Sequence, residues 1–284
     1  MLLSYKSEDG VLQIEILKKN YNEVHFIVKG VSPRFMNSLR RTMIAEVPVM
    51  AIDDVYIIEN TSVMYDEVLA HRLGLIPLRT DLDSYLLPEE CGCGTETGCN
   101  KCSAVLVLDV EGKEDGVTVV YSGDLKPHES NPEVKPVNDK IPIVKLAPGQ
   151  KIKLEAYARL GKATKHAKWS PVVRCTYKYY PIISIDGSKC TGCSSCVNVC
   201  HRNVLTLKNG KASVKDPIKC DLCNECIDKC AQNAIKVDFD KNSLIFFLET
   251  TGSLPAWRVL SEACKILMTK SETFLKQLSE IGVV

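Results

Sequence analysis

The chain has 284 residues, of which 45% are hydrophobic and 25% are charged, and its formal net charge is +1 at pH 7. This length allows two or three domains with cores of their own, and the composition is that of an ordinary globular protein. The near-neutral charge argues against autonomous binding to nucleic acid or a membrane surface, and the longest apolar run, Leu244–Leu248, is far too short to span a bilayer.

Cysteine usage is the unusual feature of the composition. Twelve of the 14 cysteines fall in three tight clusters, while Cys175 and Cys264 stand alone as expected core residues. Such short spacings favour metal ligation in a reducing compartment over the disulfides of a secreted protein. The opening segment, MLLSYKSEDG, has too short an apolar run for a secretory signal, so we expect a cytoplasmic protein.

The N-terminal region is predicted to form a hairpin followed by a helix. Apolar and polar residues alternate over residues 12–16, as in a half-buried strand, and Val24–Val28 supplies the returning strand. Ser32 is a suitable N-cap, and Pro33 suits the first helical position. The apolar row of this helix consists of Phe35, Leu39 and Met43.

From Val47 onward the pattern changes to strands and loops. A brief helix is expected at Asp66–Leu73, ended by Gly74, and Pro127–Pro148 is expected to be a loop because it is rich in proline and polar residues. Asp53 and Asp54 should face opposite sides of a strand and therefore form no acid–base pair. Further strands are predicted at Val105–Val110, Val117–Tyr121 and Ile152–Arg159.

The C-terminal region returns to a buried strand at Leu244–Leu248 and then to a long helix from Pro255 to about Ile281. A helix of this length with a broad apolar face needs a large surface to bury it. It could lie on the sheet of its own domain, but a partner chain is favoured because the N-terminal helix and hairpin would cover little of it. The apolar residues that recur every three or four positions, with one interruption at Ser271, are Trp257, Leu260, Cys264, Leu267, Phe274, Leu278 and Ile281.

Two cysteine runs form an internal repeat. CTGCSSCVNVC spans Cys190–Cys200 and CDLCNECIDKC spans Cys220–Cys230, and both have the spacing C-x2-C-x2-C-x3-C. The runs are offset by thirty residues, and the apolar pairs that follow them match as well. We therefore expect a duplicated unit of loop, short helix and strand.

The spacing is typical of a ferredoxin that binds two iron–sulfur clusters. Three thiolates on one loop can bind three irons of a cubane, and in two-cluster ferredoxins the fourth cysteine of each run binds the other cluster. Zinc and disulfides are the alternatives, but tetrahedral zinc has no use for eight crossed cysteines. The crossing makes a folded insert without iron unexpected. We assign one [4Fe–4S] cluster to Cys190, Cys193, Cys196 and Cys230, and a second to Cys200, Cys220, Cys223 and Cys226.

A third group, Cys91, Cys93, Cys99 and Cys102, lies in CGCGTETGCNKC. Four thiolates within twelve residues can surround one tetrahedral ion, and the interspersed glycines permit the sharp turns that this requires. Structural Zn²⁺ is the favoured interpretation. The alternatives are a metal-free loop and a loop oxidised to disulfides.

Motifs of catalysis were not found in the sequence. It contains no P-loop, no GxGxxG after a strand and no GxSxG, and its five histidines form no recognisable pattern. The basic stretch GKATKHAKWSP, which includes Lys168, is interpreted as a solvated loop or a protein contact. The chain is therefore expected to be a scaffold.

Three stretches resemble the alpha-like subunits of RNA polymerases, especially the archaeal members that carry a ferredoxin-like insert. They are Val31–Leu78, Ala158–Val172 and the terminal strand with its long helix. The resemblance covers nearly the whole chain and is most specific in the first stretch. It implies an α+β fold with a dimerisation domain made from residues 1–46 and 241–284, a mainly β middle domain at 47–181 with the possible zinc loop at 91–102, and a ferredoxin-like domain at 182–240.

The resemblance also implies a role and partners. The chain would be a non-catalytic part of a nucleotidyltransferase complex, the DNA-directed RNA polymerase. It would form a heterodimer with the small subunit L and, together with subunits N and P, nucleate assembly of the two large catalytic subunits, so that DNA is contacted only indirectly. Arg40–Arg41 and Asp66–Gly74 would meet the large subunits. The interface with subunit L would use Phe35, Leu39, Met43, Trp257, Leu260, Leu267, Phe274 and Leu278.

The competing interpretation is an electron-transfer subunit of polyferredoxin type in an oxidoreductase. It accounts for the cysteine runs but not for the long C-terminal helix or for Val31–Leu78. The clusters themselves are expected to stabilise the insert or to regulate assembly, with redox sensing as the alternative.

Overall fold

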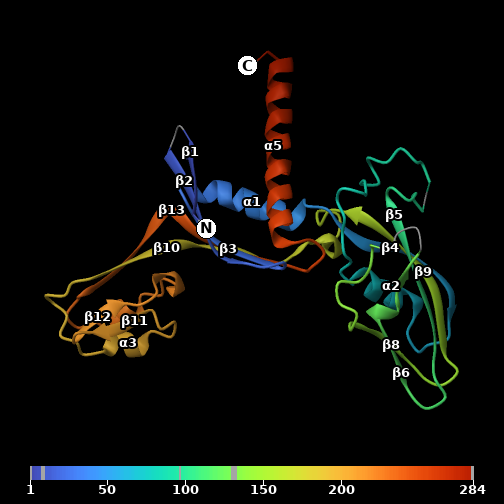
Figure 1. Cartoon of the computed structure of the whole chain (residues 1–284), viewed down its shortest axis with the longest axis horizontal. Helices are drawn as coiled ribbons and strands as arrows, with labels where there is room; N and C mark the ends of the chain where they lie inside the picture. Colours follow the sequence, from blue (N-terminus) through green and yellow to red (C-terminus); the bar gives the residue numbers. More distant parts are fainter. Residues whose placement is uncertain (1, 8–9, 96, 129–132, 283–284) are drawn as a thin grey trace. The chain divides into compact units, whose positions relative to one another are not determined.

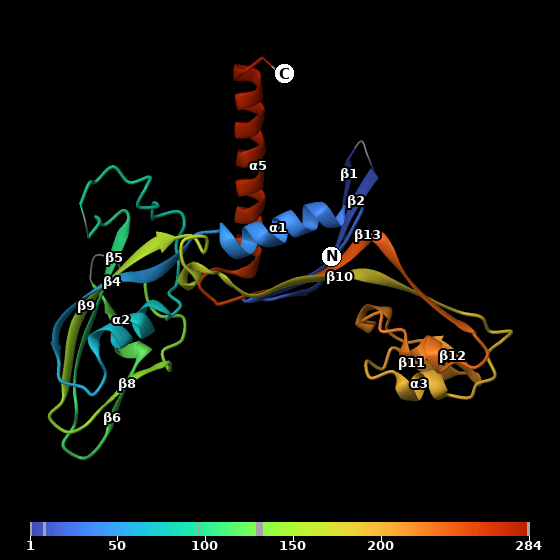
Figure 2. The same ribbon diagram turned by 180° about the vertical axis from the view of Figure 1, so that it is seen from behind.

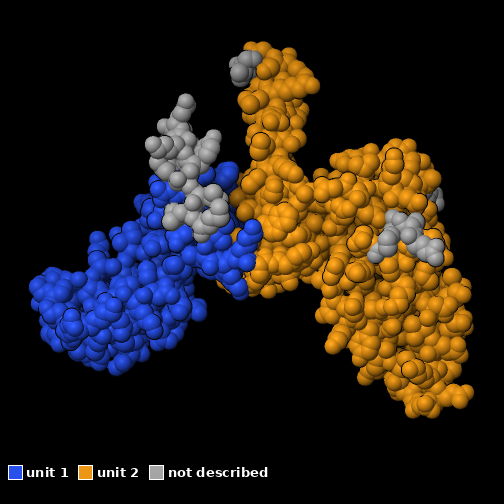
Figure 3. All heavy atoms as spheres, viewed as in Figure 1, with its two compact units in different colours: residues 1–19, 25–37, 176–247 blue, residues 20–24, 38–175, 248–284 orange. Residues whose placement is uncertain are grey.

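The computed structural model describes residues 2–7, 10–95, 97–128 and 133–282, with side chains from residue 12 onward. The chain divides into two compact units, which Figure 3 colours separately. Unit 1 comprises residues 1–19, 25–37 and 176–247, and unit 2 comprises residues 20–24, 38–175 and 248–284. The predicted domain boundaries stay predictions.

A five-stranded sheet with the order β1-β2-β3-β13-β10 lies mainly in unit 1. Its strands are β1 (Leu2–Ser7), β2 (Gly10–Lys19), β3 (Glu23–Lys29), β10 (Val172–Ile185) and β13 (Ile235–Thr250). The predicted hairpin is confirmed as β2 and β3. The sequence analysis missed β1 and β10 and predicted only the last part of β13. Figure 1 shows that β10 leads into the cysteine-rich region and β13 leads out of it, so these two strands connect that region to the sheet.

The first helix begins as the sequence predicted. α1 spans Pro33–Ala45, and the Oγ of Ser32 accepts a hydrogen bond from the backbone N–H of Phe35 at 3.3 Å. This bond satisfies one of the free N–H groups of the first turn. Leu39 and Met43 are buried, whereas the side chain of Phe35 is 50% exposed.

Unit 2 contains a four-stranded antiparallel sheet with the order β4-β9-β5-β7. These strands are β4 (Val49–Asn60), β9 (Lys151–Gly161), β5 (Ser103–Glu111) and β7 (Lys126–Pro127). The α2 helix (Asp66–Gly74) contacts β4, as predicted from its sequence signals. Alternate residues of the sheet enter one large apolar core with this helix, including Leu69, Leu73, Leu106, Leu108 and Leu154.

The prediction of a loop over Pro127–Pro148 is wrong in part. β8 (Pro142–Leu146) pairs antiparallel with β6 (Thr118–Tyr121), and residues 129–132 lie outside the described part of the chain. Ile143, Val144 and Leu146 are buried in the unit 2 core. Burial of this short apolar run against β6 outweighs the proline-rich local composition.

The long C-terminal helix, α5, spans Ala256–Glu280 and confirms the predicted element. Its first half is anchored within unit 2: Val259 and Ala263 are fully buried, and Arg258 pairs with Asp83 at 2.6 Å. Beyond Ala263 no residue of the helix is buried. Figures 1 and 2 show this half running away from the sheet of unit 2, although Lys270 still pairs with Glu46 at 2.6 Å.

The cysteine-rich insert repeats one small unit twice, as predicted. α3 (Ser195–Val199) precedes β11 (Leu205–Lys208) and β12 (Lys211–Val214), and α4 (Glu225–Asp228) precedes the start of β13. Short 3-10 helices lie at residues 122–124, 167–169 and 217–219. The predicted α+β class, with a mainly β middle part and a duplicated cysteine-rich insert, is confirmed. Among the described residues, no helix combines the length and hydropathy needed to cross a membrane.

Candidate metal centres

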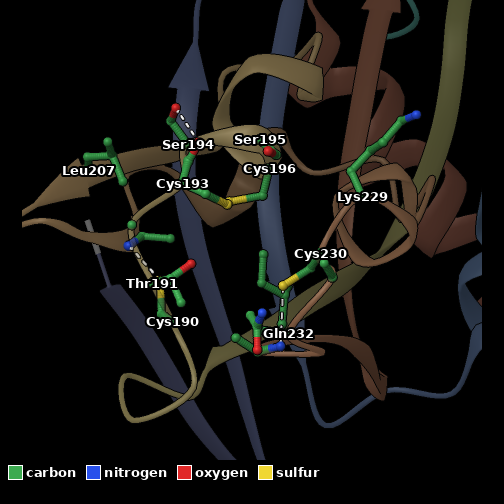
Figure 4. A pocket seen from close by; sticks show the side chains of 15 residues that line it. Cys190, Thr191, Cys193, Ser194, Ser195, Cys196, Leu207, Lys229, Cys230 and Gln232 are labelled. Carbon is green, nitrogen blue, oxygen red and sulfur yellow. Dashed lines mark hydrogen bonds between the residues drawn. The ribbon is translucent and has the colours of Figure 1, made fainter.

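The first set of four thiols lines one cavity. Cys190, Cys193 and Cys196 come from the first run, and Cys230 is the last cysteine of the second run. The cavity has a volume of about 250 Å³, and Figure 4 shows the side chains of the two segments around it. These are the cysteines that the sequence analysis assigned to the first cluster.

The second set lines another cavity in the same unit. Cys220, Cys223 and Cys226 come from the second run, and Cys200 is the last cysteine of the first run. The apolar lining of this cavity includes Ile183, Val204, Leu205 and Val237. The structure therefore brings together the crossed pattern that the spacing predicted, while the identity of the ligands stays a prediction.

Backbone conformation explains how both runs wrap in the same way. Ser194 and Asn224, which precede the two short helices, adopt left-handed φ angles of 61° and 65°. Asn203 and Asn233, which follow the runs, also lie in this region at 53° and 47°. Asparagine tolerates this conformation better than most residues. The repeat in sequence is thus a repeat in backbone geometry.

Backbone N–H groups point at the sulfurs of both sets. Ala212 donates to the Sγ of Cys190 at 3.4 Å, and Ala234 donates to that of Cys230 at 3.3 Å. In the second set Val204 donates to the Sγ of Cys200 at 3.4 Å. Hydrogen bonds of this kind stabilise thiolates and tune iron–sulfur clusters. Eight thiols in two groups of four, with N–H donors aimed at sulfur, fit the ligation of two cubanes.

The thiols differ in acidity even within one set, since burial raises the pKa of Cys196 in the first set. Hydrogen bonds from the backbone and side chain of Ser195 lower the pKa of Cys193, whereas burial raises the pKa of Cys226 to about 11. Because iron binds the thiolate form, loading of the sets must release protons.

The second set has polar neighbours that the sequence analysis did not single out. The Nζ of Lys178 donates to the carbonyl oxygen of Cys220 at 3.0 Å and lies 3.3 Å from the Oδ1 of Asp221. The Nε of Arg202 donates to the other oxygen of that carboxylate. Burial by itself would raise the pKa of Asp221, but the hydrogen bonds from Arg202 and Lys178 outweigh it and the pKa is lowered.

A further group of possible ligands lies beside the second set. The Nδ1 of His201 is 3.8 Å from a carboxylate oxygen of Glu225, and both lie within 4.8 Å of the Sγ of Cys223. All three residues are exposed. Since Cys223 already belongs to the second set, we attribute no separate metal to this group.

The third cysteine group converges in unit 2. All four Sγ atoms of Cys91, Cys93, Cys99 and Cys102 lie within 4.8 Å of one another. The Sγ atoms of Cys91 and Cys99 are 3.7 Å apart, and so are those of Cys93 and Cys102. Zinc–sulfur bonds of about 2.3 Å in a tetrahedron place sulfurs roughly 3.8 Å apart. The spacing of these atoms fits a single zinc ion.

Electrostatics of this loop also favour a cation. Hydrogen bonds from Thr95 lower the pKa of Cys93 to about 6, whereas burial raises the pKa of Cys102 to about 12. Four thiolates this close repel one another, and a divalent ion offsets that repulsion. Gly94 and Gly98 adopt φ angles of 65° and 81°, which allow the turns between the cysteines.

Two expectations about charged residues of unit 2 need correction, the second for one lysine only. A β-bulge between Ile52 and Asp54 interrupts the alternation of β4, so that Asp53 and Asp54 both reach Arg159, at 3.7 and 3.0 Å. The side chain of Lys168 is 13% exposed and its Nζ pairs with Asp53 at 2.7 Å, whereas the other lysines of the same stretch are exposed, as expected of a solvated loop. These contacts hold the GKATKHAKWSP segment against β4.

The predicted interface residues differ in exposure. Phe35, Trp257 and Phe274 are about half exposed or more, at 50%, 49% and 61%. Leu39 and Met43 are buried in the chain itself. The remaining three, Leu260, Leu267 and Leu278, are partly exposed. Their contact with a partner stays a prediction.

Two known protein families match the two cysteine-bearing parts of the chain. Residues 55–187 match the family of RNA polymerase Rpb3/RpoA insert domains, and residues 189–235 match the 4Fe-4S dicluster domain. The chain therefore carries an iron–sulfur region directly after the insert domain of a polymerase subunit.

Full-length relatives extend the match to nearly the whole chain. DNA-directed RNA polymerase subunit Rpo3 of Methanosphaera stadtmanae is 43% identical over 272 residues, covering 95% of this chain and 99% of the relative. Rpo3 of Archaeoglobus fulgidus is 45% identical and covers 95% and 98%, and that of Methanothermobacter thermautotrophicus is 45% identical and covers 92% and 97%. Because identity of this level extends over both units and both cysteine-rich regions, the chain belongs to the archaeal Rpo3 family, the alpha-like subunits of DNA-directed RNA polymerase.

Proposed function

We propose that this chain is the assembly-platform subunit of an archaeal, cytoplasmic DNA-directed RNA polymerase. It binds the small subunit L as a heterodimer, and the pair, with subunits N and P, nucleates assembly of the two large subunits. Those large subunits carry out nucleotidyl transfer and contact DNA, and this chain supplies no catalytic residue. Family membership supports the polymerase, and the uncovered apolar face of α5 carries the assembly role.

The second half of α5 presents large apolar side chains to solvent. Burying such a side chain stabilises a complex by about 1.5–3 kcal/mol, so a partner that covers several of them gains substantial binding energy. The first half of the helix is held by its own unit through Val259, Ala263 and the Arg258–Asp83 ion pair. The exposed residues are Met268 at 62%, Phe274 at 61%, Leu275 at 55% and Ile281 at 71%.

Contacts with the large subunits are proposed for two other places in unit 2. Arg41 is exposed on α1, and the exposed side chains on and before α2 include Tyr65 at 80% and Val68 at 48%. Arginine and aromatic residues are enriched in protein interfaces, which supports this assignment.

The metal sites complete the proposal. One [4Fe–4S] cluster is held by the first set and a second by the second set, while Cys91, Cys93, Cys99 and Cys102 hold a structural zinc ion. A [4Fe–4S] cluster supplies four metal–thiolate bonds and can exchange one electron. The chain's own residues join the two runs crosswise, so iron would tie the halves of the insert together. We infer a structural or assembly-regulating role from this crossing.

Co-expression with subunit L tests the assembly role. The full chain should purify with L as a stable heterodimer, and Phe274→Asp should abolish or strongly weaken it by placing a charge in the buried face. Lys276→Asp is the matched control, because two residues further along an α-helix lie about 200° around its axis. If the wild-type chain remains a monomer beside L, or if both variants behave alike, the role is refuted.

Metal analysis of anaerobically purified protein tests the cofactors and the alternative function. We expect about eight irons and one zinc per chain. An electron-transfer subunit would instead purify with a flavin, nickel or molybdenum enzyme and without polymerase subunits.

A further inference from the structure

The internal repeat allows the two iron–sulfur sites to be compared position by position. With an offset of thirty residues, Asp221 corresponds to Thr191, and Arg202 corresponds to Gln232. Each member of these pairs lies just after a cysteine of its own set. The cysteines and the backbone conformation are therefore alike in the two sites, whereas these polar residues differ between them.

In the second set, charged residues join the ligand-bearing segments. Asp221 follows Cys220, and Arg202 lies two residues after Cys200, so their ion pair links the two chain segments that supply this set. Lys178, on β10, binds both the carbonyl oxygen of Cys220 and the carboxylate of Asp221. We call Lys178, Asp221 and Arg202 the clasp. Its lysine and aspartate side chains are only 26% and 34% exposed.

The first set has no such connection. Thr191 and Gln232 are neutral, and no hydrogen bond or ion pair joins them in the described part of the chain. Figure 4 shows both residues at the first cavity.

We propose that the clasp makes the second set the retaining site, so that the chain loses iron from the first set first and passes through a half-loaded state. The inference rests on the proposed binding of two clusters. Release of a cluster requires the segments that carry its ligands to separate. In the second set this separation must also break the charge-assisted hydrogen bonds of the clasp.

The size of the effect follows from the two ion pairs. A pair of this exposure changes an equilibrium by a factor of up to about five. With two pairs sharing one carboxylate, we expect iron to leave the second set about fivefold more slowly than the first. The clasp residues are positioning residues, since none of them supplies a sulfur ligand.

The test uses the full chain, loaded anaerobically and then exposed to an iron chelator. Native mass spectrometry follows the species with eight, four and no irons, and alkylation with peptide mapping shows which cysteines become free. A four-iron species should accumulate, with Cys190, Cys193 and Cys196 alkylated while Cys220 and Cys223 remain protected. Equal rates for the two sets, or earlier release from the second, would overturn the clasp.

Variants identify the cause. Asp221→Asn should bring the release rate of the second set close to that of the first. Asp238→Asn, the matched control, removes an exposed ion pair with Lys236 outside both cavities and should leave both rates unchanged. An unaltered order of release in Asp221→Asn would refute the role of the clasp. If the wild-type chain loads only four irons, the two-cluster proposal fails. Protection of the second set by those four irons would still support the clasp, whereas protection of the first set would refute it.

Discussion

The glycines of the cysteine loop offer a graded test of the proposed zinc site. Gly98 has a φ of 81°, and a Cβ there would lie 2.7 Å from the Cβ of Ser103 and 3.1 Å from the Sγ of Cys102. Gly94 has a φ of 65° but has no atom within 4 Å of the added Cβ. Gly92 has neither a positive φ nor a close contact. Alanine at the three positions therefore separates backbone strain from steric displacement of a ligand.

The expected affinities follow from these geometries. A left-handed alanine costs about 1–2 kcal/mol, so Gly94→Ala should weaken zinc binding roughly 5- to 30-fold. Gly98→Ala adds a clash that moves Cys102 out of the tetrahedron, and we expect a loss of about 100-fold or more. Gly92→Ala should bind zinc as the wild type does.

Competition with a chromophoric chelator under anaerobic conditions measures these affinities on the full chain. Iron content serves as an internal control, because the cysteines of the two iron–sulfur sets lie elsewhere in the sequence and their iron binding should be unaffected. The reasoning is refuted if the three variants bind zinc equally, or if Gly92→Ala is as weak as Gly98→Ala.

Three further outcomes are expected. Burial raises the pKa of Cys175 to about 12, so at pH 8 this thiol should resist alkylation in the folded chain and react only on unfolding; rapid labelling of native protein would contradict its burial. Leu108→Ala removes a fully buried side chain and should destabilise unit 2 by about 2–5 kcal/mol in chemical denaturation, and a loss below about 1 kcal/mol would show that the site is not tightly packed. Lys168→Met leaves the partly buried Asp53 without its 2.7 Å partner and should cost about 1–3 kcal/mol in the same assay; unchanged stability would mean that Arg159 alone suffices.

Local signals were sufficient for the helices and the cysteine runs. α2 and α5 begin and end within a residue or two of their predicted bounds, and α1 begins at the predicted residue, because caps, proline and apolar periodicity act over a few neighbouring residues. The same holds for the crossed grouping of the two cysteine runs, since each places three thiols on one short loop and leaves the fourth for the other site.

Features that depend on contacts between distant segments could not be predicted from local signals. β8 is a strand because β6 lies beside it, and the bulge in β4 turns two adjacent carboxylates toward Arg159 on β9. Local composition carries no information about these partners.

Spacing along the chain is enough to identify the residues that could bind metal and to place the helices. Contacts between distant residues bring Lys178 to the second cysteine set, although it lies 43 residues from Asp221, and leave the apolar side chains of the second half of α5 exposed within their own unit. Both outcomes depend on which surfaces meet in space, and the free energy of those contacts comes from residues far apart in the sequence.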